Sequence, residues 1–459
     1  MIFKRLKRVF SLITAVALIS TVASSCKKSD DDFPDLSYPE DTSVVSETVS
    51  GTEETTEPLT ELTIAVPYSS DTVDLLVRLY YAKATGLIDE NYTGDPSDID
   101  FLRTIDIPWI ITSRLTTAEG AGLPSILEWE EAGELPDLML VEDLESVKDT
   151  GLICPYDEYL ATDSNINGNA IYPDALMECM FSDGTYGLPH YLSVMLLIGN
   201  SEYIPESGRI PFRTDTQTFL DYLRDIKSED LSDDMTVFAG AYELLPYLSS
   251  AFNNDVRTPY MFEGETSDPS ALNDALDYID TIYDEDLSAF SDLSGADPRI
   301  SRSACMWMSS SGAIDRWLSY YPEGLYFAML PSDNAESSGI PYASIYSMCM
   351  SEECGNKELA ASLAEFMCFD TDALKLIYSQ DPQRGYLPCV TSSSVWDLVC
   401  DDDVFGTEAM LFEQIMSSSV YCPGPVSDRA SGINNYNRDY FIARSSGDDT
   451  DYDLETCLS

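Results

Sequence analysis

"DGTYGLPHYLSVMLLIGN", residues Asp183 to Asn200, begins as a turn and continues as a strand. Its first part holds Asp-Gly, a second glycine and a proline, which are turn residues, and the rest is an apolar run with strand propensity. The segment also contains His190, the only histidine of the chain. We therefore predict a tight turn that leads into a buried strand near the middle of this 459-residue protein.

The residues before this segment alternate between strand and helix patterns. "LTIAV" (62–66) has the length and composition of a buried strand, and apolar residues at helical spacing follow it. A second strand is expected near Phe101, a helix near Ile126, another strand at Leu135–Val141 and a short helix that ends at Gly151. Strands that alternate with helices indicate an α/β lobe with a largely parallel sheet.

The ends of two of these strands carry polar side chains. Tyr68, Ser69 and Ser70 follow the first strand, and Glu142 and Asp143 follow the strand at 135–141. Ligands of open α/β sheets bind outside the carboxyl ends of the strands. These residues are therefore expected at a ligand-binding face.

The chain beyond Asn200 repeats the alternation with different content. The patterns predict helices at 214–226, 241–252, 271–283, 309–318 and 356–367, and strands at 235–240, 303–308, 325–331 and 342–350. No internal repeat of fixed period is present. The second part of the chain is thus also expected to be α/β.

The charge balance limits the partners. The chain has 25 Lys and Arg against 81 Asp and Glu, which gives a formal net charge of −56. Such a field repels phosphate groups, so it disfavours nucleic acid and small anions as partners. A neutral or cationic ligand fits better, and much of the acid is expected to be solvated surface.

Residues 1–25 have the features of an export signal. Basic residues precede "VFSLITAVALISTVA" (9–23), an apolar stretch shorter than the ~20 residues of a membrane-spanning helix. The small residues before Cys26 resemble a bacterial lipoprotein signal, although Ala23 stands where leucine is usual. This resemblance implies a lipid on Cys26 and anchoring to the outer face of the cytoplasmic membrane. An ordinary cleaved secretion signal is the alternative.

Two further features concern the exported chain. Residues 26–60 are rich in Ser, Thr, Asp, Glu and Pro, so we expect a disordered acidic tether. Cysteines at Cys179, Cys305, Cys349 and Cys368 stand among apolar residues, which predicts buried free thiols. Disulfides are the alternative, because exported proteins often pair their cysteines. A single histidine makes a zinc site improbable, and no metal is expected.

Several segments, taken in order, resemble the sugar-type extracellular solute-binding proteins of ABC importers, the family of maltose-binding protein. They are "PDLMLVEDLESVKDTGLICPYDEYL", "DGTYGLPHYLSVMLLIGN", "SACMWMSSSG", "NKELAASLAEFMCFDTDALKLI" and "GYLPCVTSSSVW". Together they cover about residues 60–400. The resemblance implies a periplasmic-binding-protein-like α/β fold with two lobes, crossing strands and a ligand cleft between the lobes.

The same resemblance implies a division of the chain. The N-terminal lobe would comprise 61–194 plus 345–380, and the C-terminal lobe 195–344 plus 381–459. The chain would cross between them near 191–195, 343–347 and 380–385. Closure of the lobes around a ligand would then be a hinge motion.

The crossings supply most of the candidate ligand residues. Strand alternation would place His190 on one face and Tyr191 and Ser193 on the other. Ser193 stands where the maltose-binding relative has a ligand-contacting carboxylate, and Gly312 stands where the family often has tryptophan. His190 is interpreted either as a ligand contact or as a hinge residue satisfied by the backbone. The full set of candidates is Tyr68, Ser70, Glu142, Asp143, His190, Tyr191, Ser193, Trp307, Ser309, Tyr342, Ser344, Tyr386 and Trp396.

These residue types suit a saccharide. A sugar ring presents an apolar C–H face to aromatic rings and a polar rim to carboxylates and hydroxyls. The resemblance further implies a monomer without cofactor that delivers its ligand to an ABC permease. Gly-x-Ser-x-Gly, His-Glu-x-x-His and Gly-x-x-x-x-Gly-Lys do not occur in the sequence, so we do not expect an enzyme. The alternatives are a surface sensor or adhesin, or a binding protein for a polyamine or peptide.

Overall fold

The computed structural model describes residues 60–89, 91–160, 171–252, 269–289, 297–332, 342–416, 422–423, 427–446 and 452–453. The chain divides into two units, Met1–Leu59 and Thr60–Ser459, and all described residues belong to the second. The predicted signal peptide, Cys26 and nearly all of the tether therefore lie outside the described residues.

The body begins with the predicted strand and helix. Strand β1 (Thr60–Val66) leads into helix α2 (Ser70–Ala84). The Ser69 hydroxyl accepts a hydrogen bond from the Thr72 amide at 3.2 Å, which satisfies one of the amide groups left unpaired at a helix start. Both elements confirm the sequence prediction.

The prediction of a strand near Phe101 was wrong. Phe101 lies in α3 (Ile99–Leu102), a short helix whose preceding residue, Asp98, accepts hydrogen bonds from the Asp100 and Phe101 amides. These side-chain hydrogen bonds stabilise a helical turn, so the segment does not form a strand. The strand that pairs with β1 is β2 (Trp109–Leu115), several residues further along.

The main sheet has the order β2-β1-β3-β11-β7-β9-β8, and the N-terminal part of the body contains its first five strands. Strands β1, β2 and β3 (Leu138–Val141) are parallel, whereas β11 (Tyr342–Ser351) and β7 (Leu188–Asn200) each run antiparallel to the strand before them in this order. Strand β3 is apolar throughout and β1 is apolar from Ile64 to Val66, because helices cover both faces there. Leu62, Ile64 and Leu140 share a core with α2, α12 (Lys357–Phe369) and α13 (Thr371–Gln380). Ala65 and Met139 point the other way.

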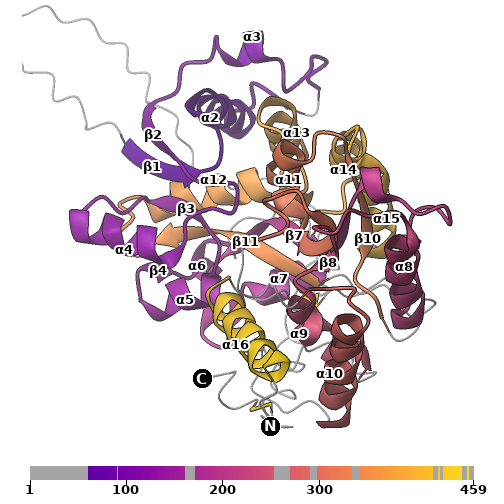
Figure 1. Ribbon diagram of the computed structural model, residues 1–459. Coiled ribbons are helices and arrows are strands. Elements are labelled where there is room, and N and C mark those ends of the chain that lie inside the picture. The colour runs from indigo at the N-terminus through magenta and orange to yellow at the C-terminus, as the bar shows by residue number, and fades with distance from the viewer. Residues whose placement is uncertain are drawn as a thin grey trace, which may run out of the picture. The chain divides into compact units, whose positions relative to one another are not determined.

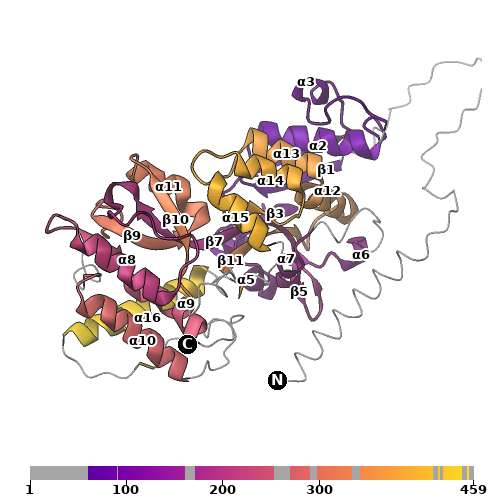
Figure 2. The same cartoon turned by 90° about the vertical axis from the view of Figure 1, so that its right-hand side faces the viewer.

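Those opposite residues pack against a second helical layer. It comprises α4 (Leu123–Ala132) and α5 (Leu144–Asp149), which contribute Ile126 and Val147 to the core around Ala65. Figure 2 shows α2 and α13 on one side of this sheet and α5 on the other. The N-terminal part of the body is therefore a layered α/β structure, as the alternation of patterns predicts.

The second part of the chain builds its own core. Strand β8 (Thr236–Ala239) is parallel to β9 (Ala304–Ser310), which pairs antiparallel with β7, and β10 (Leu325–Met329) also pairs with β7. Helices α8 (Thr216–Ser228), α9 (Leu245–Phe252), α10 (Pro269–Asp284) and α16 (Ser427–Ser445) belong to this part. The predicted helices and strands here are confirmed.

Strand β7 joins the two parts. Its first half pairs with β11, from Leu188 to Val194, and its second half pairs with β9, from Met195 to Gly199. Both β7 and β11 run through the middle of the molecule in Figure 1. The apolar run of the opening segment is thus one long strand that pairs in both parts of the main sheet.

The turn before β7 has the predicted chemistry. Asp183 lies in the tight turn of a small hairpin formed by β5 (Met180–Phe181) and β6 (Gly184–Thr185). A Cβ atom on Gly187 would lie 2.8 Å from the Ser347 Cβ and 3.0 Å from a Leu144 methyl group. Only glycine therefore allows this turn to pack against β11 and α5.

The remaining short elements connect these layers. They are β4 (Ile153–Cys154), α6 (Asp157–Leu160), α7 (Pro173–Glu178), η2 (Ser201–Tyr203), η3 (Ala241–Leu244), η5 (Ser311–Ala313), α11 (Ile314–Tyr320), β12 (Leu387–Pro388), α14 (Ser393–Cys400), α15 (Gly406–Met416) and β13 (Cys422–Pro423). Within the described ranges, no helix has the length and apolarity to cross a membrane.

The cysteines behave as apolar core residues. Cys154, Cys179, Cys305, Cys349, Cys354, Cys368 and Cys389 are unpaired and buried, and Cys400 is unpaired and partly exposed. Burial raises the pKa of the Cys179 and Cys305 thiols to about 12. The prediction of buried free thiols is confirmed for all four cysteines on which it was based.

Candidate ligand-binding site

The crossing strands present one polar face. Ser193 of β7 is paired directly with Ser344 of β11, and Tyr191 is paired with Tyr346. Directly paired residues of an antiparallel ladder, and residues two apart on one strand, share a face of the sheet. These four side chains therefore lie on the same side of the crossing.

Tyrosines from five segments meet on this face. The tyrosine cluster comprises Tyr68, Tyr191, Tyr346, Tyr378 and Tyr386. The Tyr386 ring centroid lies 5.9 Å from that of Tyr191 and 5.6 Å from that of Tyr346, and Tyr378 lies 5.9 Å from Tyr191. Burial raises the pKa of all five phenols, so each stays a neutral hydrogen-bond donor at physiological pH.

His190 lies against this cluster because the strand is irregular. Tyr191 pairs with Tyr346 but Pro189 pairs with Ser347, so His190 is an extra residue in a β-bulge. The Tyr68 hydroxyl consequently bonds both the His190 Nε2 atom and the Tyr191 hydroxyl. The prediction that His190 and Tyr191 face opposite ways was wrong, because simple alternation does not hold at a bulge.

His190 is a neutral, buried residue. Burial lowers its pKa to about 3, and its Nδ1 atom has no hydrogen-bond partner within the described residues. Its Nε2 bond to Tyr68 is a side-chain contact, so the backbone-satisfied hinge role expected for it is not the arrangement found. We place His190 beneath the polar face and not on it.

Two carboxylates lie above the tyrosines. Glu119, in the loop between β2 and α4, and Glu142, directly after β3, act together with burial to raise the pKa of Tyr346. Burial, the Tyr346 phenol and then Glu119, which is hydrogen-bonded to Tyr386, raise the pKa of Tyr386. Both acids follow the carboxyl ends of parallel strands, where ligands of such sheets bind.

The backbone holds both carboxylates in place. The Ala121 amide donates to the Leu140 carbonyl at 2.8 Å, and the Glu142 amide donates to the Ala121 carbonyl, which ties the loop to the end of β3. The Glu142 carboxylate also lies beside Gly122, the residue that precedes α4, where the helix dipole favours negative charge. The loop therefore presents Glu119 and Glu142 on a fixed backbone.

Glu119 was missed from the sequence. The second strand was expected near Phe101, so the predicted candidates include no residue of the loop that follows its true position at 109–115. Tyr346 is likewise not among the predicted candidates. The available signal was the glycine-rich turn "EGAG" after the apolar segment "WIITSRL".

A serine junction adjoins the polar face at Ser193. It comprises Ser193, Ser311, Gly312 and Gly385. Ser193 Oγ accepts a hydrogen bond from the Gly312 amide at 3.0 Å, and Ser311 Oγ accepts one from the Val194 amide at 3.0 Å and donates one to the Gly385 carbonyl. The junction therefore joins β7, η5 and the segment before β12.

Gly312 lies under the Tyr386 ring. A Cβ atom there would come within 2.5 Å of the Tyr386 Cζ atom and 2.6 Å of its hydroxyl oxygen. Glycine at this position, where the resembling family often has tryptophan, thus makes room for a ring from another segment. The aromatic surface at this point is supplied by Tyr386.

Three of the predicted aromatic residues are buried outside the tyrosine cluster. Trp396 is fully buried and donates its indole N–H to the Val390 carbonyl at 2.8 Å. Trp307 is also fully buried and stacks on Tyr321. The Tyr342 ring packs on Tyr247 in the second core, so all three are core residues in this structure.

Three of the predicted polar residues have local roles. Ser309 accepts a hydrogen bond from the Trp317 indole at 2.9 Å. Asp143 accepts one from the Ser146 amide and thereby caps α5, and Ser70 is the exposed first residue of α2. The structure brings together the other candidates, namely Tyr68, Glu142, His190, Tyr191, Ser193, Ser344 and Tyr386.

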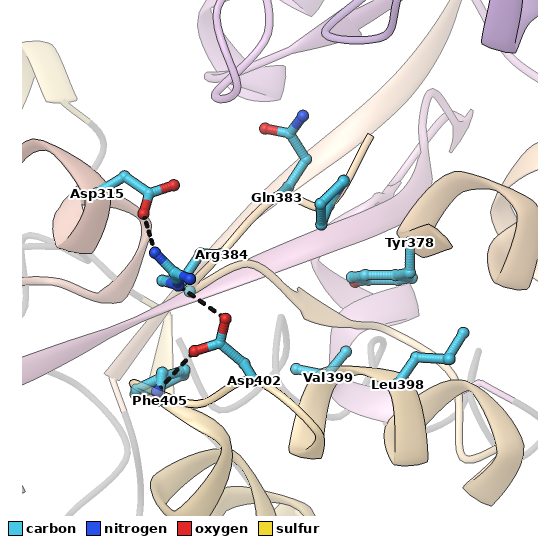
Figure 3. A pocket seen from close by; sticks show the side chains of 10 residues that line it. Asp315, Tyr378, Gln383, Arg384, Leu398, Val399, Asp402 and Phe405 are labelled. Carbon is cyan, nitrogen blue, oxygen red and sulfur yellow. Dashed lines mark hydrogen bonds and ion pairs between the residues drawn. The ribbon is translucent and has the colours of Figure 1, made fainter. Parts of the chain in front are cut away.

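A pocket lies on the segment between α13 and β12. It has a volume of about 190 Å³, and its lining includes Phe405 and Tyr378 of the tyrosine cluster. Figure 3 shows Arg384 between Asp315 and Asp402, with distances of 2.7 Å to each carboxylate. Ligand pockets usually have volumes of roughly 300–1,000 Å³, so this one is small for a saccharide. The described residues contain no group of three or more side chains suited to a metal ion.

Comparison with solved structures identifies the fold. An ABC substrate-binding protein of Listeria monocytogenes in complex with cycloalternan has a TM-score of 0.60 at 14% identity, over 87% of this chain and 96% of that chain. The sugar-binding protein MalE of Xanthomonas citri has a TM-score of 0.56 at 14% identity, over 87% and 94%. CpMnBP1 with mannobiose bound has a TM-score of 0.56 at 15% identity, over 87% and 98%.

No family model matches the sequence, and no characterised protein matches it at the sequence level. At identities of 14–15% the structural likeness shows the fold alone. That fold is the periplasmic-binding-protein-like α/β fold predicted from the sequence, with two lobes joined by crossing strands.

Proposed function

We propose that the protein is an exported substrate-binding lipoprotein that captures a saccharide and delivers it to an ABC permease. The observation that carries this proposal is the position of the polar face on the crossing strands of a fold that sugar-binding proteins share. Glu119, Glu142 and Ser344 are partly exposed there, above the buried tyrosine cluster. A binding role also agrees with structural neighbours that are binding proteins and not enzymes.

The chemistry of the face suits hydroxyl-rich ligands. Carboxylates accept hydrogen bonds from sugar hydroxyls, and a buried neutral phenol can donate to the same carboxylate and hold it in one orientation. Tyr386 is 2% exposed and Tyr346 is 5% exposed, so ring stacking would require the loop around Glu119 to move. We therefore assign recognition chiefly to the carboxylates and assign the phenols to their orientation.

A thermal-shift screen tests the ligand class. The purified protein would be heated with mannobiose, maltotriose and acarbose, and separately with spermidine, single amino acids and short peptides. A ligand at 100 times its dissociation constant stabilises the native state by ~2.7 kcal/mol. About 1 kcal/mol raises the melting temperature of a large domain by roughly 2–4 °C, so binding should be visible. Stabilisation by saccharides alone is the expected result.

A cationic ligand is the second candidate. It is favoured by the two carboxylates of the face and by the net charge of −56. The same screen separates the two, because stabilisation by spermidine without any response to sugars would replace the saccharide assignment and leave the fold unchanged.

Delivery is tested with the transporter. The protein would be mixed with its cognate permease in membrane vesicles, and ATP hydrolysis would be measured with and without the saccharide. Ligand-dependent stimulation supports transport. Saccharide binding without any stimulation would favour a surface sensor or adhesin.

A further inference from the structure

We propose that Ser311 is a positioning residue for the candidate site: its hydroxyl group ties η5 to β7 and to the segment before β12, and thereby sets where the Tyr386 phenol meets Glu119. Ser311 is fully buried and does not itself belong to the polar face. The consequence for ligand binding rests on the proposed function, whereas the placement of Tyr386 does not.

The Ser311 hydroxyl uses its full bonding capacity. A serine hydroxyl has one donor and two acceptor positions. The donor goes to the Gly385 carbonyl, one acceptor takes the Val194 amide at 3.0 Å, and the Ser193 hydroxyl lies 3.3 Å away. An alanine at this position would leave a buried carbonyl and a buried amide without these partners, which burial makes unfavourable.

The same junction fixes the start of the segment that carries Tyr386. Gly385 has a φ of +82°, and a Cβ atom there would lie 1.9 Å from the Ser311 carbonyl oxygen. The two backbones therefore touch at Gly385, and Tyr386 follows directly. Because Gly312 leaves room for its ring, the phenol of Tyr386 extends over η5 toward Glu119. The position of the phenol is thus a consequence of the junction.

The segment is pinned on its other side as well. Asp381 accepts a hydrogen bond from the Ser69 amide at 3.0 Å, and the Gln383 amide group contacts the Pro67 carbonyl. The segment thus has an attachment at each end, to the loop after β1 and to η5. The attachment to η5 depends on a single side-chain oxygen, Ser311 Oγ, which also bonds β7. Ser311 is therefore the residue to substitute.

Fluorine NMR tests the placement without a ligand. The protein would be labelled with 3-fluorotyrosine, and the Tyr386 signal would be identified by its loss in Tyr386→Phe. Ser311→Ala should shift this signal. Gly312→Ala, whose new Cβ displaces the ring directly, should shift it too. Ser309→Ala is the matched control, because Ser309 is two residues away and bonds the Trp317 indole. An unshifted Tyr386 signal in folded Ser311→Ala would overturn the proposal.

Saccharide affinity provides the functional arm. With mannobiose, maltotriose and acarbose as probes, Ser311→Ala should weaken binding about tenfold, the effect of about 1.4 kcal/mol. In Ser311→Ala combined with Tyr386→Phe, the losses should not multiply, because one residue acts through the other. Independent, multiplying losses would mean that Ser311 stabilises the fold without positioning Tyr386, and would contradict the proposal.

The NMR and affinity measurements distinguish failure of the proposed function from failure of the proposed role of Ser311. If the wild type binds none of the probes, the proposed function fails, while the fluorine spectra still decide the placement of Tyr386. If Ser311→Ala does not fold, Ser311→Cys replaces it in both measurements, since the thiol keeps the side-chain shape but is a weak donor. A Tyr386 signal that stays in place in Ser311→Cys would then contradict the proposal.

Discussion

At the level of single residues, the surroundings of a side chain in the structure can differ from those that the sequence pattern predicts. His190 is the only histidine of the chain, and strand alternation predicted that it lies on the opposite face from Tyr191. The bulge places it beside Tyr191, and burial makes it neutral. The residue type identified the correct region, but its role depended on one extra residue in the ladder, which a single sequence does not reveal.

The neutral state of His190 predicts a specific pH dependence. Its pKa is about 3 in the folded protein and about 6.5 when unfolded, so below pH 6.5 only the unfolded chain gains this proton. Stability from this group is complete above pH 6.5 and falls by up to ~1.4 kcal/mol per pH unit as the pH drops toward 3. Between pH 7 and pH 5 the free energy of unfolding of the wild type should fall about 2 kcal/mol more than that of His190→Asn, measured with urea. Equal decreases would contradict the buried neutral histidine.

Ligand affinity should not follow this titration. Because His190 stays neutral between pH 5.5 and 8, saccharide affinity measured by calorimetry should be constant through pH 6.5. A change in affinity centred near pH 6.5 would place a titrating imidazole in contact with the ligand, in conflict with the structure.

Substitutions of Trp396 and Tyr386 should affect different properties, namely stability for Trp396 and saccharide binding for Tyr386. Trp396→Ala removes a fully buried ring and should cost ~3–5 kcal/mol of unfolding free energy. Tyr386→Phe removes only one hydroxyl, so it should cost ~1 kcal/mol while weakening saccharide binding. Urea unfolding and calorimetry on both variants check this. A stable Trp396→Ala that loses binding would restore Trp396 to the site.

Most helices and strands of the fold could be predicted from the sequence. The turn residues before β7, the alternation of strand and helix patterns, and the helical spacing of apolar residues after β1 all predicted correct elements. The failure at Phe101 had a physical cause, since the Asp98 side chain caps a helical turn in a stretch of apolar residues too short to show a period. That error also hid Glu119, which follows the true strand.

The turn before β7 gives a prediction at this scale. Gly187→Ala would place a methyl group within 3.0 Å of Ser347 and Leu144, and overpacking of this kind costs ~1–3 kcal/mol. Gly355→Ala is the matched control, because nothing lies within 4 Å of its Cβ position. Denaturant unfolding should show a loss for the first variant and a change within ~0.5 kcal/mol for the second. Equal stability of the two would mean that the turn does not pack as described.

For the whole molecule, sequence resemblance predicted the architecture, but only some of the predicted residues meet at the candidate site. Tyr68, Glu142, His190, Tyr191, Ser193, Ser344 and Tyr386 converge, whereas Trp307, Ser309, Tyr342 and Trp396 do not. Spacing along the chain cannot distinguish a ring at a cleft from a ring in the core, because both follow a strand. That distinction depends on packing among segments that are distant in sequence.

Attachment to the membrane is a prediction for the whole molecule. The basic residues, the short apolar stretch and the acidic segment behind it predict that Cys26 carries lipid. Cys26→Ala should be released into the medium or keep its signal uncleaved, as fractionation and mass spectrometry would show. Mature, cleaved Cys26→Ala found in the membrane fraction would contradict a lipid anchor at this residue.

The proposed function requires that a saccharide binds on the polar face of the crossing strands. Hydrogen–deuterium exchange with mass spectrometry, with and without the saccharide that stabilises the protein most, tests it directly. Peptides that contain Glu119, Glu142, Ser193, Ser344 and Tyr386 should be protected, whereas peptides around Trp396 and around Asp402 should not change. Protection confined to peptides around Asp402 or to another surface, with the crossing strands unchanged, would contradict binding at the polar face.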